Sequence, residues 1–375
     1  MKVVATAIIV LFNVAPSILD AQRVVTRDSA DVRIVTSPPR SKLPVAFRVG
    51  PQLWDVGGLN DDPARELGRD GGHHAVVLSN GTIVVSDRTR IAYFDARGKF
   101  IGSVGRKGGG PGEFELVGAM CVRTGDTLQV NDGGIHRTTI ITPDRAIARI
   151  VPGRRTGELK GCLDTKWTIT TELFPKGDGW TQWVHVRGVA DDGVPRVDFG
   201  DFPLRGMGVA MRTGALAGHG SRLALGSGIE PSVEVHDTTG RLVQLIRLDE
   251  KPASITAAEM EAGVGMTQGA NLKTGASFKV PTPKGAPMTW PAYGELRYDP
   301  LGRLWMEDYT KQLGTGWWTV FAASGESLGR MQLPKSAKGT PPLVVGFTRD
   351  AVLVRRLDDD GAPHVTAYRL IPVNR

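Results

Sequence analysis

A strand-end position recurs along this chain at almost constant spacing. The steps between its successive copies are 48, 47, 47, 85 and 47 residues. A period of this length is typical of propellers, solenoids and arrays, in which each unit buries its faces against its neighbours. The regular steps predict one unit repeated six times, and the long step predicts an insertion in the fourth interval. The six copies are Phe94, Thr142, Val189, His236, Phe321 and Tyr368.

The segments between the turns have the composition of β-strands. They are short and rich in Val, Ile, Thr and aromatic residues, and long helix-forming stretches are nearly absent. The first unit is the clearest, with strands at residues 74–78, 82–87, 90–94 and 99–104 and an Asn80-Gly81 turn after the first of them. Four antiparallel strands joined by short turns form a propeller blade. We therefore predict an all-β fold, a six-bladed β-propeller with four-stranded blades.

The later units repeat this scheme with drift, and the last one lacks a fourth strand. Residues 52–57, upstream of the first blade, are similar to its outer strand at residues 100–105. An N-terminal strand in the last blade would close the ring and remove an exposed sheet edge. We expect this closure. The predicted blades two to six cover residues 119–151, 162–202, 222–248, 295–333 and 344–370.

The insertion occupies residues 249–293, between the predicted blades four and five. Thr256 and Glu259 stand at its start with the spacing of a capping box, which predicts a short helix. The stretch 269–291 is polar and rich in Pro and Gly, so we expect a loop there. Long loops in compact proteins are lids or disordered excursions. The sequence leaves both interpretations open.

Residues 1–21 have the pattern of a secretory signal peptide. Lys2 supplies the positive start, residues 3–14 are mostly apolar, and Ala21 offers a small residue for cleavage before Gln22. The apolar run is too short to span a bilayer, and we expect no membrane span elsewhere. We therefore expect residues 22–375 to form a single propeller domain that is exported to the periplasm or secreted.

The two cysteines of the chain, Cys121 and Cys162, fall in the predicted innermost strands of consecutive blades. In an oxidising compartment they could form a disulfide between blades. The alternative is a pair of small buried thiols.

The formal net charge of +7 does not by itself predict a nucleic-acid partner. Lys and Arg are scattered among Asp and Glu, and there is neither a long basic run nor an alternation of basic and aromatic residues. We expect a solvated surface with a modest cationic excess and no binding of nucleic acid.

The segment 94–105, followed by 106–114, resembles the exported bacterial six-bladed β-propellers with NHL-like repeats. The resemblance continues at residues 302–305, 318–321 and 364–370, and its most specific part is the Gly-Pro-Gly-Glu-Phe motif that ends at Phe114. Predicted blades two and three depart most from the pattern, because neither has a full Phe-Asp-x-x-Gly turn. The resemblance implies the fold, but it implies no substrate, since members of this group mostly lack an assigned activity.

Polar residues at one end of the predicted channel form the candidate site. Loops between the second and third strands of each blade share one face of a propeller with the connections between blades, so residues there could surround one opening. Each of them is individually more often a turn or cap residue. The candidates are His73, His74, Asp87, Arg88, Arg106, Glu113, Asp132, His136, Asp308, Tyr309 and Lys311.

The recognisable motifs of catalysis and cofactor binding are missing. The predicted starts of the innermost strands carry almost no oxygen ligands, and there is no H-E-x-x-H motif, so we expect no metal and no cofactor. The Gly-rich stretch 105–112 lacks a phosphate-loop lysine, and no G-x-S-x-G motif is present. We predict a monomeric binding or scaffold protein for an unidentified small molecule, glycan or protein. The alternative is a propeller-type hydrolase or lyase with His73 or His74 in the channel.

Overall fold

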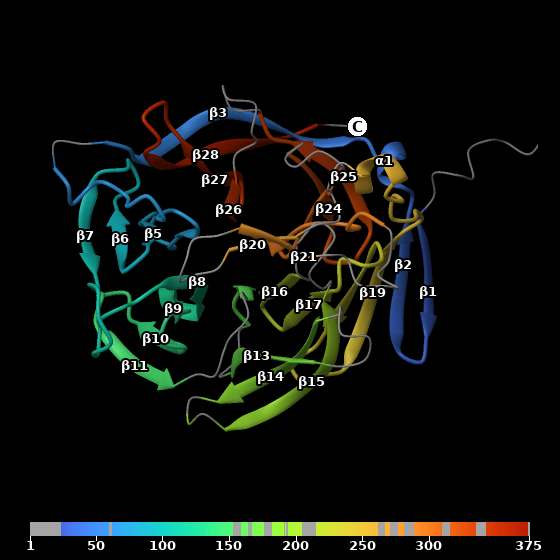
Figure 1. Ribbon diagram of the computed structural model, residues 1–375, viewed down its shortest axis with the longest axis horizontal. Coiled ribbons are helices and arrows are strands. Elements are labelled where there is room, and N and C mark those ends of the chain that lie inside the picture. The colour runs from blue at the N-terminus through green and yellow to red at the C-terminus, as the bar shows by residue number, and fades with distance from the viewer. Residues whose placement is uncertain are drawn as a thin grey trace, which may run out of the picture.

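The described chain is nearly all β, and its sheets are arranged around a central axis (Figure 1). The predicted signal peptide and Lys311 lie outside the described residues. None of the described helices is long and apolar enough to cross a membrane. This computed structural model describes residues 24–59, 62–152, 159–163, 167–175, 182–190, 192, 194–204, 215–261, 267–270, 277–280, 289–309, 316–334 and 343–373.

The first two sheets each contain four antiparallel strands that follow one another in chain order. The second strand of the first sheet is buried along its whole length, which explains its unbroken Ile-Val-Val run. The strands of the first sheet are β4 (Ala75–Val77), β5 (Ile83–Asp87), β6 (Arg90–Phe94) and β7 (Phe100–Val104). Those of the second sheet are β8 (Val117–Arg123), β9 (Thr127–Asp132), β10 (Arg137–Ile141) and β11 (Ile147–Pro152).

The third unit differs from the prediction at its innermost strand. Its sheet has three strands, β13 (Trp167–Pro175), β14 (Gln182–Ala190) and β15 (Pro195–Leu204). The short strand β12 (Leu159–Gly161), directly before Cys162 of the predicted innermost strand, pairs in parallel with β16 (Ala215–His219) instead. Gly218 permits this close approach, because a Cβ atom there would lie 3.2 Å from the backbone carbonyl carbon of Cys162.

The next sheet contains seven strands and corrects the predicted fourth blade. That blade was expected to begin at Arg222, but β16 precedes β17 (Arg222–Gly226) as the innermost strand. Two N-terminal strands extend its outer side, since β2 pairs in parallel with β19 and in antiparallel with β1. The remaining strands are β18 (Ser232–His236), β19 (Leu242–Leu248), β1 (Val25–Ser29) and β2 (Val32–Ser37).

The last sheet contains eight strands and is joined by β3 (Val45–Gly57). The first part of β3 pairs in parallel with β25, and the rest pairs in antiparallel with β28 from Phe47 to Gly57. The predicted pairing of residues 52–57 with the last strand is therefore confirmed, and the strand is longer than predicted. The other strands are β22 (Leu296–Tyr298), β23 (Leu304–Glu307), β24 (Trp317–Phe321), β25 (Ser327–Gln332), β26 (Leu343–Phe347), β27 (Ala351–Leu357) and β28 (Pro363–Pro372).

The hydrophobic core lies between neighbouring sheets. Val84 of β5 and Ile91 of β6 pack with Leu128 and Val130 of β9. On the other face of the first sheet, Val85 belongs to a cluster with residues of β27 and β28. Buried clusters of this kind hold each sheet between its two neighbours, as in a ring of repeats.

Residues 25–57 form an N-terminal strap along the outer edges of the last three units of the chain (Figure 1). Strand β2 borders β19, and β3 borders first β25 and then β28. Between them, the short 3-10 helix Arg40–Lys42 places Arg40 against the carboxylate of Asp308, 2.9 Å away. Arg40 also pairs with Glu250. The strap therefore joins segments more than 200 residues apart in the sequence.

A half-buried cluster of polar side chains holds the strap to the last strand. Asp55 of β3 accepts hydrogen bonds from Thr366 Oγ1 and from His364 Nδ1, the latter at 2.6 Å, and it pairs with Arg356 at 3.1 Å. The hydrogen bond to Asp55 raises the pKa of His364. Burial alone would raise the pKa of Asp55, but its hydrogen bonds from His364 and Thr366 hold that pKa below its ordinary value.

We expect the stability contributed by this cluster to depend on pH. The contribution of His364 is complete below its ordinary pKa of 6.5 and is lost as the pH rises through the raised value. The contribution of Asp55 is complete above 3.8 and is lost as the pH falls through the lowered value. Thermal unfolding of the wild type and of His364→Gln should therefore differ more at about pH 5 than at about pH 9. A difference that stays constant over this range would contradict the prediction.

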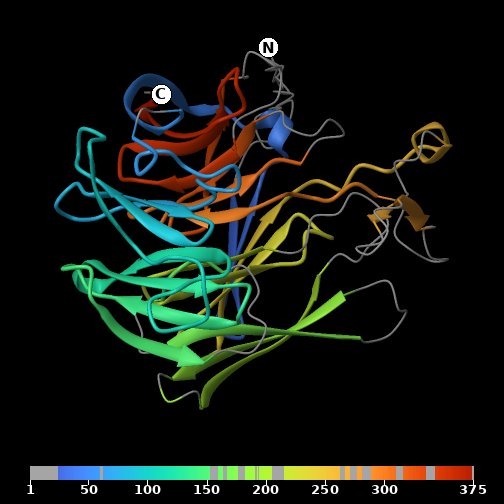
Figure 2. The same ribbon diagram turned by 60° about the vertical axis from the view of Figure 1, so that its left-hand side comes forward.

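The insertion contains the predicted helix and an unpredicted hairpin. Helix α1 (Ala257–Glu261) begins after a reciprocal capping box, in which Thr256 N–H donates to Glu259 Oε2 at 2.7 Å and Glu259 N–H donates to Thr256 Oγ1 at 3.2 Å. The helix is thus confirmed. The prediction of a loop over 269–291 was wrong in part, because β20 (Thr267–Ala270) and β21 (Ser277–Val280) pair in antiparallel. Figure 2 shows α1, in gold, projecting from the sheets.

Candidate functional site

A cavity of about 520 Å³ lies on the central axis. Its walls are the innermost strands β4, β8, β16, β22 and β26, together with Cys162 after β12. Most of the lining residues belong to the ends of these strands and to the turns that lead into the next strand. The cavity therefore opens at the end of the channel opposite to the loops chosen from the sequence. The described residues of the insertion, which joins the end of β19 to the start of β22, are not among those that line the cavity.

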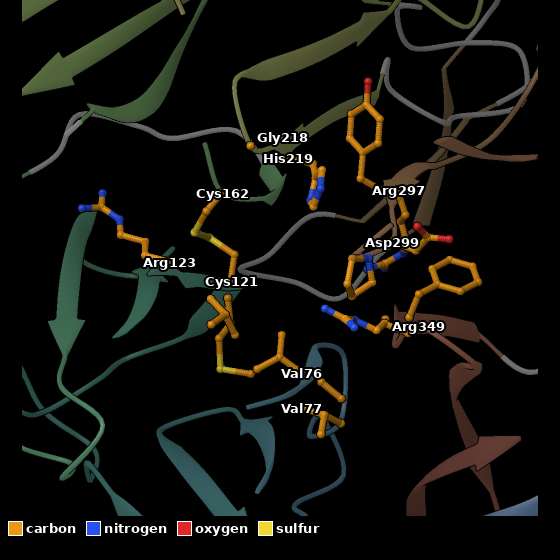
Figure 3. A pocket seen from close by; sticks show the side chains of 18 of the residues that line it. Val76, Val77, Cys121, Arg123, Cys162, Gly218, His219, Arg297, Asp299 and Arg349 are labelled. Atoms are coloured by element: carbon orange, nitrogen blue, oxygen red, sulfur yellow. A yellow bond between two sulfur atoms is a disulfide. The ribbon is translucent and has the colours of Figure 1, made fainter. Parts of the chain in front are cut away.

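One side of the cavity is apolar. Val76 and Val77 of β4 and Val122 of β8 line it, and these side chains are half-buried. The disulfide between Cys121 and Cys162 forms the adjoining wall (Figure 3), with Cα atoms 5.5 Å apart. This bond ties the segment after β12 to β8. The disulfide thus fixes the position of the segment beside the apolar side of the cavity.

Two side chains that could carry positive charge point into the cavity from the other side. Figure 3 shows Arg349 and His219 directed toward the central space. Arg349 follows β26, and its guanidinium group makes no ion pair or hydrogen bond with any residue that the structure describes. Only its backbone carbonyl is used, as the acceptor of a hydrogen bond from Arg303 Nη2 at 3.2 Å. His219 ends β16, and its ring lies 5.8 Å from that of Tyr298.

The other charged side chains of the lining are already paired. Arg297 donates to Glu295 Oε2 at 2.9 Å and to the carbonyl of Val345 at 3.1 Å. Asp299 accepts from Arg303 Nε at 2.5 Å and from Trp305 Nε1 at 2.8 Å.

Backbone N–H groups complete the shell of Asp299. Its carboxylate also accepts hydrogen bonds from the N–H groups of Leu301 and Arg303. This carboxylate is therefore saturated and its charge is balanced, so it is not available as a base or as a ligand-binding group.

The remaining cation, Arg123, is turned away from the cavity (Figure 3). Its Nε donates to Gln129 Oε1 at 2.9 Å, and this partner is neutral. The positive charge that faces the cavity without a carboxylate partner among the described residues is therefore that of Arg349. Two opposite charges 4 Å apart attract by about 1 kcal/mol in water and by about 4 kcal/mol at an effective dielectric constant of 20. A partly enclosed cavity of this kind favours an anion.

Burial raises the pKa of Tyr298, although the nearby Arg222 acts against this shift. The phenol is therefore neutral at physiological pH and remains a hydrogen-bond donor. Because its ring lies beside that of His219, it also limits the orientations open to the imidazole. Tyr298 and His219 thus form one polar corner of the cavity.

The carboxylates predicted from the sequence organise loops. Asp87 accepts from Gly68 N–H at 2.9 Å and from Arg90 Nε at 2.8 Å. Asp132 accepts from the N–H groups of Glu115, Leu116, Gly134 and Ile135. Asp308 is held by Arg40, Arg330 and Thr319. Asp87 and Asp132 end the second strand of their sheets and Asp308 directly follows one, so the predicted residues mark a repeated position that holds the loop to the next strand.

The other predicted residues are spread over the same end of the molecule. Arg88 pairs with Asp70 at 2.5 Å, and Arg106 pairs with Glu113 at 2.8 Å. Tyr309 lies 6.0 Å from Trp290 between ring centroids. His73 is exposed, His74 is buried, and His136 is half-buried with a φ of 51°. None of the predicted residues that the structure describes lines the axial cavity, and a site formed by them stays a prediction.

Within the described residues, no group of three or more His, Cys, Asp or Glu side chains is placed to hold a metal ion. The cavity offers a ligand the side chains of Arg349, His219 and Tyr298 together with its apolar wall. Sequence reasoning missed His219 and Arg349 because one ends a strand and the other lies in a turn, and neither belongs to a recognisable motif. The signal that could have found them is positional, since the turns after all innermost strands share one face.

Comparisons with known proteins give a likeness in fold. No protein-family model matches the chain, and no curated protein matches its sequence. A solved member of the DUF4221 family from Bacteroides vulgatus is 11% identical, with a TM-score of 0.50, covering 88% of this chain and 99% of that one. With the sheets placed around a central axis, this likeness indicates a β-propeller-like fold.

Two further solved structures have lower TM-scores. A Bacteroides fragilis protein named as exported is 10% identical, with a TM-score of 0.49, covering 91% of this chain and 100% of that one. Virginiamycin B lyase from Staphylococcus aureus, in an inactive variant with quinupristin, is 12% identical, with a TM-score of 0.41, covering 81% of this chain and 97% of that one.

Proposed function

We propose that this chain is an exported six-bladed β-propeller that binds a small molecule in its axial cavity. The sheet pairings support six blades if the eight-stranded sheet is divided at β3, and if β12 stands in the place of an innermost strand. The Cys121–Cys162 disulfide supports an oxidising compartment and hence export. On this interpretation, residues 1–21 are removed as a signal peptide and residues 22–375 form one domain.

The observation that carries the proposal is a cavity with uncommitted polar groups. Its volume of about 520 Å³ falls in the range of small-molecule sites, and its lining combines an apolar side with convergent polar side chains. Structural polar groups are normally paired, as Arg297 and Asp299 are here. The exposed Arg349 and the half-buried His219 have no ion pair or side-chain hydrogen bond with the described residues, and both are directed into the cavity, so they are accessible to a ligand there.

Binding is better supported than the hydrolase or lyase alternative. General base catalysis needs a titratable group that is free to accept a proton near the substrate. The carboxylate of Asp299 already accepts four hydrogen bonds from the protein. His219 remains as one titratable group, and it has no carboxylate partner to orient it among the described residues. A partner of this kind is the usual companion of a histidine base.

A neutral apolar dye tests whether the cavity accepts ligands. Phenylnaphthylamine, which fluoresces in apolar surroundings, is expected to bind the wild type saturably. Val77→Trp, which fills the apolar side of the cavity, is expected to weaken this binding by roughly tenfold or more. The measurement is a fluorescence titration of both purified proteins.

The matched control is Ile101→Trp, because it adds the same side chain to an exposed position on the outer strand β7. It is expected to bind the dye as the wild type does. Circular dichroism and thermal unfolding show whether each variant is folded. Equal binding by folded Val77→Trp and by the wild type would place the dye elsewhere and overturn the proposal.

A further inference from the structure

We propose that the ligand of the axial cavity is an organic anion, one acidic group carried on an apolar body. This inference rests on the proposed function, since it assigns a chemical class to the ligand of the same cavity. It goes beyond that proposal because it assigns a partner to each part of the ligand. Arg349 and His219 bind the anionic group, and the valine side of the cavity contacts the apolar body.

The charges of the lining residues indicate that the ligand carries a negative charge. Arg297 is neutralised by Glu295, and Asp299 by Arg303. Arg349 keeps its charge without a protein partner among the described residues. A cationic ligand would be repelled by Arg349 and would find no uncommitted carboxylate among the lining residues that the structure describes. A carboxylate, sulfonate or phosphate would gain a charge-assisted hydrogen bond.

The positions of the Arg349 and His219 side chains indicate where the anionic group of the ligand would lie. Arg349 follows β26 and His219 ends β16, so they belong to different sheets on either side of β22. Figure 3 shows both side chains directed toward the same central space. An anionic group held there could accept hydrogen bonds from both. A guanidinium group also matches the planar geometry of a carboxylate, which an ammonium group does not.

The opposite side of the cavity selects the rest of the ligand. Val76, Val77 and Val122 offer apolar surface without a hydrogen-bonding side chain. A polar body such as an unsubstituted sugar would lose its water there without gaining partners. An aliphatic or aromatic body would bury apolar surface instead. The cavity thus fits an amphipathic anion better than a free inorganic ion or a neutral sugar.

A pair of dyes that differ by one acidic group tests the inference. Anilinonaphthalene sulfonate is phenylnaphthylamine with an added sulfonate, so the ratio of their affinities isolates the effect of the charge. We expect the wild type to bind the sulfonate dye more tightly than the neutral dye by roughly tenfold or more, the size of a hydrogen bond between charged groups.

Substitution of the cation should remove this preference. In Arg349→Gln the affinity for the sulfonate dye is expected to fall by roughly tenfold, while that for the neutral dye changes by less than about twofold. His219→Gln should lower the same ratio. Arg369→Gln, on β28 outside the cavity, makes the same change in net charge and is expected to keep the preference.

The outcomes separate the two proposals. Saturable binding of the neutral dye that Val77→Trp blocks, without any preference for the sulfonate dye, would overturn the anion assignment and leave the cavity as a binding site. A preference that survives in Arg349→Gln would also overturn the assignment. If Val77→Trp weakened the binding of neither dye, the proposal that the cavity is a binding site would itself be overturned.

Discussion

Replacing Asp308 with alanine is expected to lower the free energy of unfolding by about 3–5 kcal/mol, the range for breaking a buried ion pair from one side. The Asp308 side chain is 1% exposed, and its carboxylate lies 2.9 Å from Arg40 and 2.8 Å from Arg330. It also accepts a hydrogen bond from Thr319 Oγ1 at 2.6 Å. Its removal leaves two largely buried guanidinium groups without this partner. Urea denaturation measures the loss.

Asp350→Ala is the matched control. Asp350 also pairs with an arginine, Arg369, but the side chains of the pair are 60% and 50% exposed. Exposed pairs contribute at most about 1 kcal/mol, so this variant should unfold almost as the wild type does. If Asp308→Ala lost as little as Asp350→Ala, the buried cluster would have no special role in the fold.

A double-mutant cycle attributes part of the loss to the N-terminal strap. Arg40 belongs to the strap, whereas Asp308 follows β23 in the last sheet. The coupling free energy between Arg40→Ala and Asp308→Ala is expected to be about 1–3 kcal/mol. A coupling near zero would mean that the ion pair between Arg40 and Asp308 does not help to hold the strap, and that any contribution of Arg40 comes from its pairing with Glu250.

The repeat and the closing strand could be predicted because they depend on local patterns. Turn residues at a fixed period mark each unit, and the similarity between residues 52–57 and 100–105 indicates an outer strand. The rest of the strap gives no comparable signal. Val25–Ser29 is exposed along its whole length, and β2 pairs in parallel with a strand about two hundred residues away. The pairing of two such distant strands depends on tertiary packing, which cannot be read from the residues of either strand alone.

The cavity escaped prediction for a different physical reason. Sequence patterns single out Asp87, Asp132 and Asp308 because a carboxylate recurs at the end of the second strand or directly after it, and recurrence here reflects a repeated structural task. Groups that bind a ligand on the axis of a ring need not recur. Arg349 and His219 occur at one turn each, and only the arrangement of the sheets brings them to the same space.

Breaking the Cys121–Cys162 disulfide is expected to lower the free energy of unfolding by about 4 kcal/mol on the chain-entropy estimate. The bond closes a loop with a sequence separation of 41 residues. It also fixes the segment after β12. Strand β12 itself pairs with β16, and not with the three-stranded sheet that follows it in the sequence. The double variant Cys121→Ser/Cys162→Ser, compared with the oxidised wild type in urea, measures the loss.

The effect of this variant should extend to the cavity, because Cys121 and Cys162 line it. Release of the segment loosens the wall beside Val122, so the affinity for phenylnaphthylamine should fall together with stability. Arg349→Gln provides the contrast, since it removes an exposed side chain and should alter the preference between the two dyes with little change in stability. Unchanged binding of the neutral dye by the folded double variant would mean that the disulfide stabilises the ring without shaping the cavity.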